Sequence, residues 1–228
     1  QLAIQVLASA FLKQAKQSID IFIPAMTHRQ SAQPMRLSHL WLHYGFSTCR
    51  DWDRIKNTKK SVLTQMPLGS AAICGSNLNI DLDRLANELG FQTGPWSAYD
   101  SISDRDFIIE AVSGYSILAL HLTKLCEDLI YWSSTPVGLF RLPREWSSGS
   151  SIMPNKRNPD IPEIARARCS QIIGKAFEAL CLMKGIPSGY SSDMHELKRV
   201  FMHSHFLLIS CLKALTPFVE KISVSKDC

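Results

Sequence analysis

The sequence is poor in glycine, has no closely spaced cysteines and contains no long uncharged stretch. Its seven cysteines, an odd number, lie far apart in the 228 residues, and no two of them form a Cys-x-x-Cys pair. Such spacing is typical of reduced, mostly buried thiols rather than of a disulfide framework, and it favours a reducing compartment, which we take to be cytoplasmic. The longest uncharged runs, 111–123 and 200–212, are too short to cross a bilayer, so we expect no membrane partner.

Charge is also sparse and mixed in sign. Charged residues make up 20% of the chain against 46% hydrophobic residues, and the formal net charge is +5. This composition suits a helical globular protein with one good core. The basic residues form no stripe and do not alternate with aromatic residues, which argues against a nucleic-acid partner. A mild positive charge is compatible with an anionic small-molecule substrate.

No segment shows the alternation typical of a β-strand, whereas the helical spacing of apolar residues is extensive. Between residues 108 and 129 such residues recur every three or four positions. The sequence therefore predicts an all-α fold, an elongated helical bundle with no sheet beyond a short hairpin. Because such long helices carry more apolar surface than one chain of this size covers, we expect them to pack against other subunits. The expected helices are 2–19, 36–57, 81–89, 100–132, 159–184 and 192–221.

Polar loops interrupt these helices, and the segment SSGSSIMPNKRNPD at 147–160 is the most unusual of them. Its glycine and its two prolines prevent a regular helix. It has few of the acidic side chains that make most loops soluble, and it offers hydroxyls, amides and two cations instead. The segments 24–34, 66–79 and 189–198 are also rich in side-chain donors. Together the four segments could surround a polyanionic ligand.

Two other patterns have simpler explanations than a binding site. GSAAICGSN has the glycine spacing of a phosphate loop, but it lacks the Gly-Lys-Ser/Thr end and a preceding strand. His39 and His43 have the i, i+4 spacing of zinc ligands, but the sequence offers no third ligand nearby, so we expect surface or helix-packing roles and no metal site. His28 is different, because it lies in a loop bounded by prolines, where helix packing does not require a histidine.

The loops carry a family resemblance. GSSIMPNKRNP is similar to the signature G-S-S-x-M-P-x-K-x-N-P of the fumarase/aspartase superfamily. THRQSAQP is similar to T-H-x-Q-x-A-Q-P of its argininosuccinate lyase family, and PLGSAAICG and SDRDF resemble segments characteristic of that family. KGIPSGYSSDMHELK is similar to K-G-L-P-S-x-Y-x-x-D-x-Q-x-x-K, with His195 at the position of the glutamine. The resemblance covers nearly the whole chain.

The resemblance implies an all-helical homotetramer that needs no metal or organic cofactor. It also implies a reversible elimination, in which a C–N bond beside a succinyl group breaks and fumarate is released. Ser150 would be the base that removes the proton, and His28, with Glu163 as its charge partner, would protonate the leaving nitrogen. Lys156 and Asn158 would stabilise the doubly charged intermediate. The T-H-x-Q loop and the G-S-S loop of one site would come from different chains. The residues that match the family's substrate contacts are Thr27, Arg105, Tyr190 and Lys198, and His195 stands at a further contact position.

Departures from the family's pattern leave alternatives open. His195 replaces a glutamine among the substrate contacts, and Ser97 replaces an asparagine. The family's N-terminal region and C-terminal domain have no counterpart here, so we interpret residues 1–228 as a central helical lyase domain truncated at both ends. A lyase for a different N-succinyl compound is one alternative. A catalytically silent paralogue is another, either truncated or kept for its structure, as the lens crystallins of this family are.

Overall fold

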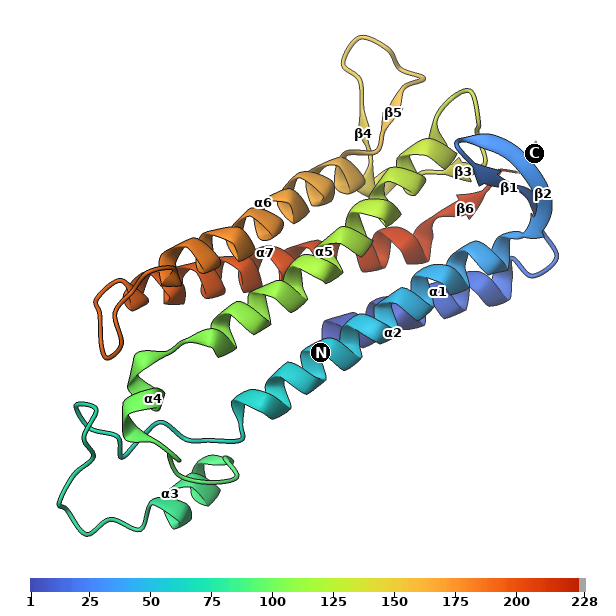
Figure 1. Cartoon of the computed structure of the whole chain (residues 1–228). Coiled ribbons are helices and arrows are strands. Elements are labelled where there is room, and N and C mark those ends of the chain that lie inside the picture. Colours follow the sequence, from blue (N-terminus) through green and yellow to red (C-terminus); the bar gives the residue numbers. More distant parts are fainter. Residues whose placement is uncertain (226–228) are drawn as a thin grey trace. The chain divides into compact units, whose positions relative to one another are not determined.

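The computed structural model describes residues 1–225, and most of its elements are helices (Figure 1). The long helices are α1 (Leu2–Gln17), α2 (Leu37–Val62), α5 (Asp106–Ser133), α6 (Asp160–Met183) and α7 (Met194–Lys221). The shorter ones are α3 (Leu82–Leu89), α4 (Ala98–Ser103) and the 3-10 helix η1 (Arg144–Trp146). The all-α prediction is thereby confirmed. The strands are β1 (Phe22–Thr27), β2 (Gln30–Arg36), β3 (Phe140–Arg141), β4 (Ser148–Gly149), β5 (Arg157–Asn158) and β6 (Ser223–Val224).

The predicted helix 100–132 is in fact two helices, α4 and α5, separated at Asp104. The Asp104 carboxylate accepts hydrogen bonds from the backbone N–H groups of Arg105 (2.7 Å) and Asp106 (3.0 Å), at the start of α5. A short acidic side chain that bonds to nearby amides in this way favours the beginning of a new helix over continuation of the old one. The other long helices lie within a few residues of their predicted bounds, although α2 continues past residue 57 to Val62.

The segment 24–34, expected to be a polar loop, belongs to the antiparallel hairpin β1–β2. Pro24 and Pro34 face each other in its register, and the ladder is irregular between Pro24 and Met26. Prolines are tolerated here because both strands of a two-stranded hairpin are edge strands, where a missing N–H need not interrupt a sheet. The described residues contain two further antiparallel pairs, β3–β6 and β4–β5, where the sequence predicted no more than one hairpin.

The chain divides into two compact units, which we describe separately. Unit 1 comprises Gln1–Trp52, Ile117–Gln171 and Phe206–Cys228, and unit 2 comprises Asp53–Ser116 and Ile172–His205. The boundaries fall inside helices, so that α2, α5, α6 and α7 contribute residues to both units. The single-domain expectation for residues 1–228 stays a prediction.

The core of unit 1 contains stacked aromatic rings from α1, α2 and β3. The ring centroids of Phe11 and Trp41 are 6.3 Å apart, and those of Trp41 and Phe140 are 5.3 Å apart. None of the three exposes more than 4% of its surface. Burying a side chain of this size contributes roughly 1.5–3 kcal/mol to folding. The Gln14 side-chain amide also donates to the carbonyl oxygen of Val219 at 2.7 Å, which ties α1 to the end of α7.

The core of unit 2 includes the contact of α5 with α7. Tyr115 stacks on Phe201 with 5.9 Å between ring centroids, and its hydroxyl hydrogen-bonds to Nδ1 of His205 at 3.2 Å. Burial raises the pKa of the Tyr115 hydroxyl. Val112 and Leu197 are completely buried in the same unit. The apolar spacing in the sequence therefore identified the buried faces of both helices.

Three cysteines of unit 1 come together from different helices. Cys126 on α5, Cys169 on α6 and Cys211 on α7 are all free and buried, and the Cys211 thiol donates to the carbonyl oxygen of Ala165 on α6 at 3.8 Å. Burial raises the pKa of Cys126 to about 12. The expectation of reduced, buried thiols holds for these three. Three other described cysteines are exposed, namely Cys49, Cys74 and Cys181.

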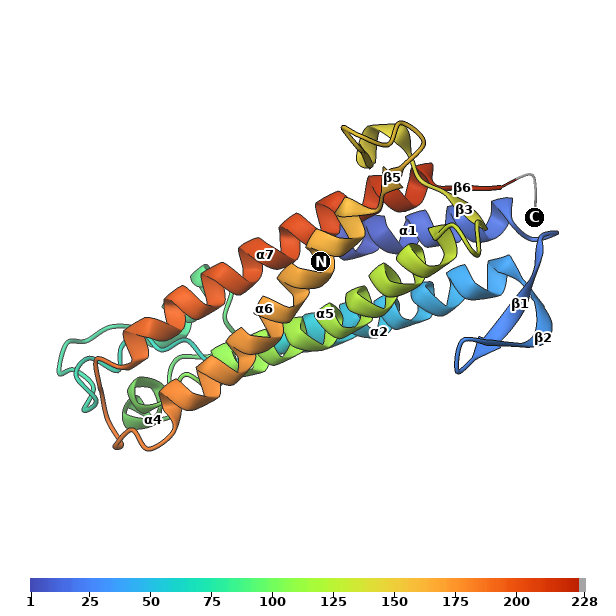
Figure 2. The ribbon, with the colours of Figure 1, turned by 90° about the horizontal axis from the view of Figure 1, so that it is seen from above.

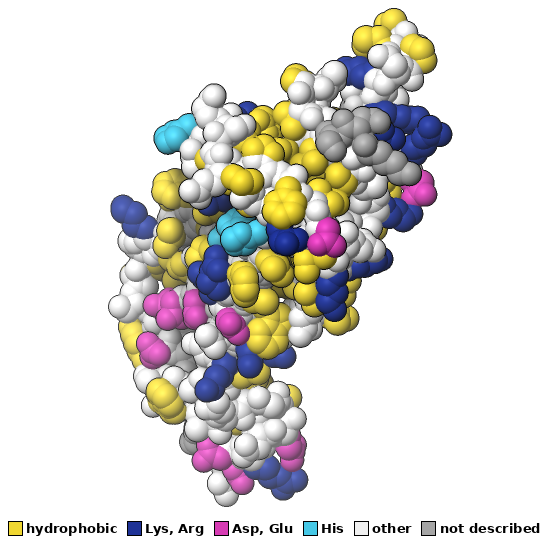
Figure 3. Space-filling view, turned by 90° about the vertical axis from the view of Figure 1, so that its right-hand side faces the viewer, with side chains coloured by type: hydrophobic (Ala, Val, Ile, Leu, Met, Phe, Trp, Pro, Cys, Tyr) yellow, Lys and Arg dark blue, Asp and Glu magenta, His cyan; other side chains and the backbone are white. Residues whose placement is uncertain are grey.

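Both units also expose large apolar side chains. On the face shown in Figure 3, hydrophobic side chains reach the surface among basic and acidic ones. Apolar surface of this kind, surrounded by polar residues, is typical of faces that pack against another protein. Exposures between 58% and 74% are found for Leu2, Phe46 and Phe206 in unit 1 and for Phe177 and Met202 in unit 2.

Helix α5 is the one described helix that is long and apolar enough to span a membrane by length and composition alone. A core helix of a globular domain passes the same test. Near its C-terminal end α5 carries Glu127 and Asp128, and both carboxylates have hydrogen-bond partners on other elements of unit 1.

Candidate active site

The signature segment 147–160 forms the hairpin β4–β5 and leads directly into α6. Ser148 pairs with Asn158 in the register of the hairpin, and the Asn158 side-chain amide donates to the Ser148 hydroxyl at 3.2 Å. The Ser148 backbone N–H donates to the Asp160 carboxylate at 2.8 Å. Hydrogen bonds from Ser148 hold the pKa of the Asp160 carboxyl below its usual value. These contacts fix Asn158 at the base of the hairpin.

Ser150 lies in the loop of this hairpin and is half-buried. Its Oγ accepts hydrogen bonds from the backbone N–H groups of Ile152 (3.3 Å) and Met153 (3.1 Å). Two donors at one oxygen stabilise negative charge on that oxygen. Lys156 belongs to the same loop and is exposed, and within residues 1–225 no bond joins it to Ser150. The loop geometry suits a serine that works as an alkoxide.

Glu163 lies in the first turn of α6, as its place in the sequence predicted. Its side chain is exposed, and its backbone N–H donates to the carbonyl oxygen of Pro159 at 3.1 Å. An acidic side chain here is favourable in any case, because the N-terminal end of a helix carries partial positive charge. The position of Glu163 is thus compatible with a structural role as well as with the predicted catalytic one.

Thr27 and His28 lie at the tip of the hairpin β1–β2, and both are exposed. Thr27 pairs with Gln30, which leaves His28 and Arg29 as a two-residue loop. Both loop residues have positive φ, 53° and 57°. The imidazole of His28 is therefore presented on a tight turn rather than on a flexible loop.

The two hairpins do not meet within unit 1. Figure 2 shows β1–β2 and β4–β5 on opposite sides of the helices of this unit. No hydrogen bond or ion pair among residues 1–225 connects His28 with Ser150 or Glu163. The chain therefore brings Ser150, Asn158 and Glu163 into one local segment and places His28 elsewhere.

Arg105, a predicted substrate contact in unit 2, has a local structural role. Its guanidinium donates to the carbonyl oxygens of Ser101 (3.3 Å) and Ile102 (3.2 Å), near the C-terminal end of α4. A cation at this end of a helix satisfies carbonyl groups that have no partner inside the helix. The role of Arg105 as a substrate contact stays a prediction.

The other predicted contacts of unit 2 lie on the loop before α7 and in its first turns. The Gly189 N–H donates to the Ser103 hydroxyl at 2.8 Å, which brings this loop beside α4. Next to Gly189, the Tyr190 hydroxyl hydrogen-bonds to Nε2 of His195, and the two rings are 5.8 Å apart. Tyr190, His195 and Lys198 are all exposed. The residue that departs from the family's pattern is thus bonded directly to a predicted substrate contact.

A cavity of about 390 Å³ adjoins this loop in unit 2. Ser97, the second departure from the family's pattern, lines it. Its hydroxyl also accepts a hydrogen bond from the Asp100 N–H at 3.3 Å and so caps α4. The other residues that line the cavity are Tyr99, Asp100, Ser103, Asp104, Met183, Ile186, Pro187 and Ser188.

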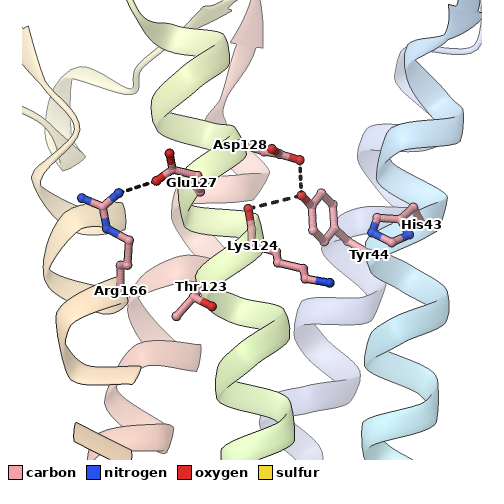
Figure 4. A pocket seen from close by; sticks show the side chains of 7 residues that line it. All are labelled: His43, Tyr44, Thr123, Lys124, Glu127, Asp128 and Arg166. Atoms are coloured by element: carbon pink, nitrogen blue, oxygen red, sulfur yellow. Dashed lines mark hydrogen bonds and ion pairs between the residues drawn. The ribbon is translucent and has the colours of Figure 1, made fainter. Parts of the chain in front are cut away.

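A second cavity, of about 430 Å³, lies in unit 1 among residues with polar side chains, and the sequence did not predict it (Figure 4). In it the Tyr44 hydroxyl donates to the Asp128 carboxylate, and the Arg166 guanidinium donates to Glu127. Burial raises the pKa of Asp128 and lowers that of His43. Two adjacent carboxylates in a predominantly apolar stretch of α5 are a signal that could have identified this site. Its remaining lining residues are Thr123 and Lys124.

Two curated relatives resemble the chain along almost all of its length. The argininosuccinate lyase of Oceanobacillus iheyensis is 34% identical over 224 residues, which cover 98% of this chain and 49% of that protein. The argininosuccinate lyase of Pelobacter propionicus is 37% identical over 221 residues, which cover 97% of this chain and 48% of that protein. The chain thus spans about half the length of the curated relatives it matches.

The fold is also found among solved structures. A class II fumarase from Schistosoma mansoni superposes with a TM-score of 0.87 at 20% identity, covering 99% of this chain and 52% of that chain. Identity this low shows the fold alone. The family evidence comes from a family model described as Lyase, which matches residues 2–174, more than half of the chain. The chain therefore belongs to this lyase family, within the fumarase/aspartase superfamily.

Proposed function

We propose that this chain is the central part of a carbon–nitrogen lyase that eliminates fumarate from an N-succinyl substrate, and that the substrate is argininosuccinate, giving arginine and fumarate. One observation carries the proposal furthest: the Oγ of Ser150, in the superfamily's signature loop, accepts two backbone N–H groups. The names of the two relatives support the choice of substrate.

In the proposed reaction Ser150, as the alkoxide, takes a proton from the succinyl carbon next to a carboxylate. The electron pair left behind makes a doubly charged intermediate of the aci-carboxylate type. Preorganised donors that meet this charge lower the barrier, and Lys156 and Asn158 have that role. The C–N bond then breaks, its electron pair goes to the nitrogen, and His28, with Glu163 as its charge partner, delivers the proton directly or through a group that it positions.

The separation of the two hairpins supports a site that is shared between chains. Since the hairpins that carry His28 and Ser150, β1–β2 and β4–β5, lie on opposite sides of the helices of unit 1 (Figure 2), a second copy of the chain can supply the part of the site that the first lacks. The exposed apolar side chains of both units suit such an assembly. We propose a homotetramer with shared sites, in the cytoplasm, which the free core thiols favour.

Complementation tests the shared site. In the complete protein, His28→Asn and Ser150→Ala each remove a catalytic residue, and the two residues of one site come from different chains. Tetramers that mix the two variants contain some sites with an unmodified His28 from one chain and an unmodified Ser150 from another, so fumarate release should reappear after co-refolding. Mixed tetramers that stay inactive would show that His28 and Ser150 of one chain serve the same site.

A second candidate function is elimination from a different N-succinyl compound. It is favoured by His195, whose ring is bonded to Tyr190 where the family's pattern has a glutamine. A neutral imidazole offers one donor and one acceptor on different edges of a ring, or two donors when it is protonated, so it cannot place a donor and an acceptor side by side as an amide does.

A panel of N-succinyl substrates distinguishes the two candidate functions. Each compound is incubated with the complete protein, and fumarate is measured by its ultraviolet absorbance. Argininosuccinate should be cleaved with the highest kcat/KM. A higher kcat/KM for another N-succinyl compound would establish the second candidate, and no fumarate from any of them would contradict the proposed function. Ser150→Ala is the negative control.

A further inference from the structure

The turn that carries His28 is conformationally unusual. A two-residue hairpin loop with positive φ at both positions has the backbone of a type I′ turn, which favours Asn-Gly and similar pairs. Here the two positions are His28 and Arg29, with φ of 53° and 57°. Residues with long side chains adopt this region only against a steric cost, so contacts outside the turn must help to hold it.

Arg29 makes such contacts with α5. Its guanidinium donates to Oε1 of Glu127 and lies 5.2 Å from the ring centroid of Tyr131. Glu127 and Tyr131 are four residues apart on one helix, so they form one docking point for the guanidinium. The ion pair joins positions 98 residues apart in the sequence and is the kind of contact that fixes a hairpin tip against a helix.

Glu127 also contacts the helix that follows the signature loop. Its Oε2 accepts from the Arg166 guanidinium, as Figure 4 shows. The hydrogen bond from Arg29, followed by that from Arg166, holds the pKa of Glu127 below its usual value. Arg166 lies three residues after Glu163, one turn further along α6. One carboxylate therefore connects the turn of His28 with the helix of Glu163.

We propose that Arg29, Glu127 and Arg166 form an anchor that holds the turn of His28 in place, and that Arg29 and Glu127 are positioning residues for the proton transfer assigned to His28. The inference rests on the proposed function for its catalytic consequence. In the pattern T-H-x-Q, Arg29 occupies the unspecified position, so the anchor is a property of this chain rather than of the pattern.

The anchor is tested first on this 228-residue chain, without any assay of activity. Hydrogen exchange of the paired amides in residues 26–31 reports local opening of the turn, and the ring signals of His28 in NMR spectra report its surroundings. Arg29→Met, which keeps most of the stem and removes the charge, should accelerate exchange about 1.5-fold to fivefold, as expected for a partly exposed ion pair. Glu127→Gln should do the same.

Two further variants make the test specific. Arg29→Lys keeps the charge and should restore most of the protection. Arg36→Met is the matched control, because Arg36 lies at the base of the same hairpin with an ion pair to Asp20 at 3.3 Å and the Phe22 ring at 4.8 Å. Arg36→Met should leave the His28 signals unchanged. Exchange unaffected by Arg29→Met, or an equal change in Arg36→Met, would overturn the anchor.

The catalytic consequence is tested in the complete protein. Arg29→Met should lower kcat about tenfold with KM nearly unchanged, because a displaced proton donor affects the transition state more than binding. Arg29→Lys should recover most of the rate. An unchanged kcat in a variant whose turn has loosened would refute the positioning role. If the unmodified protein releases no fumarate, the proposed function is wrong. The hydrogen-exchange experiment does not depend on activity, so it still tests whether Arg29 and Glu127 hold the turn of His28.

Discussion

Ser150→Ala tests the chemistry of the signature loop most directly. The variant loses an oxygen that accepts N–H groups at 3.3 and 3.1 Å, in a loop that is only half-buried. Because water can replace part of these bonds, the free energy of unfolding should fall by only about 0.5–1.5 kcal/mol. Loss of the base should lower kcat by a factor on the order of 10² to 10⁴. That factor corresponds to about 3–5 kcal/mol of transition-state stabilisation.

The assay is fumarate release by the complete protein at saturating argininosuccinate, with KM measured in parallel. KM should change little, because the hydroxyl acts in the transition state rather than in ground-state binding. Ser151→Ala is the matched control, since it removes a hydroxyl from the adjacent, exposed residue. If Ser150→Ala retains more than about a tenth of the wild-type kcat, another group is the base and our reasoning about the loop is wrong.

Three further predictions can be checked independently. Gly69→Ala should lower the free energy of unfolding by about 1–3 kcal/mol in urea titrations, because φ is 97° and a Cβ would lie 2.5 Å from Leu82 Cδ2; an unchanged midpoint would contradict this. Tyr44→Phe should cost about 1–3 kcal/mol at neutral pH, because it leaves the half-buried Asp128 carboxylate without its donor. Burial raises the pKa of Asp128 above its value in the unfolded chain. The protonated carboxyl therefore contributes to the free energy of unfolding at low pH, and this contribution is lost as the pH rises through the folded-state pKa. The cost of Tyr44→Phe should therefore grow between about pH 4 and pH 7, and a cost independent of pH would refute the argument. His195→Gln should shift the kcat/KM ratio among N-succinyl substrates, and an unchanged ratio would mean that this position does not select the substrate.

The helices could be predicted because their signal is local and repeated. Val112, Leu118 and Leu125 recur at helical spacing, and the structure buries all three. The break at Asp104 was missed, since an acidic residue before a helix suits both a continuing helix and a new one. The hairpin β1–β2 was missed because Pro24 and Pro34 usually indicate a loop. Proline is tolerated in edge strands, and the sequence spacing does not reveal that both strands of this hairpin are edge strands.

The candidate site was predictable only where it is contiguous. Ser150 and Asn158 lie in one motif, so their neighbourhood follows from the chain itself. The bond between Tyr190 and His195 is also local. The ion pair of Arg29 with Glu127 spans 98 residues, and neither residue belongs to a motif position that the family specifies. Such a pair follows from the tertiary packing of a turn against a helix, and local sequence patterns do not predict this packing.

The burial of Cys126, Cys169 and Cys211 makes them reporters of how often the chain opens. A thiol reagent that reaches only exposed sulfur should modify Cys49, Cys74 and Cys181 within the mixing time, and the core thiols only when α5, α6 and α7 part. Because the three come from three helices of one unit, their modification should follow a single slow rate. The dependence of that rate on reagent concentration distinguishes the rate of opening from the rate of the labelling reaction. The same protein thereby contains a fast internal standard and a slow stability probe, with no label added.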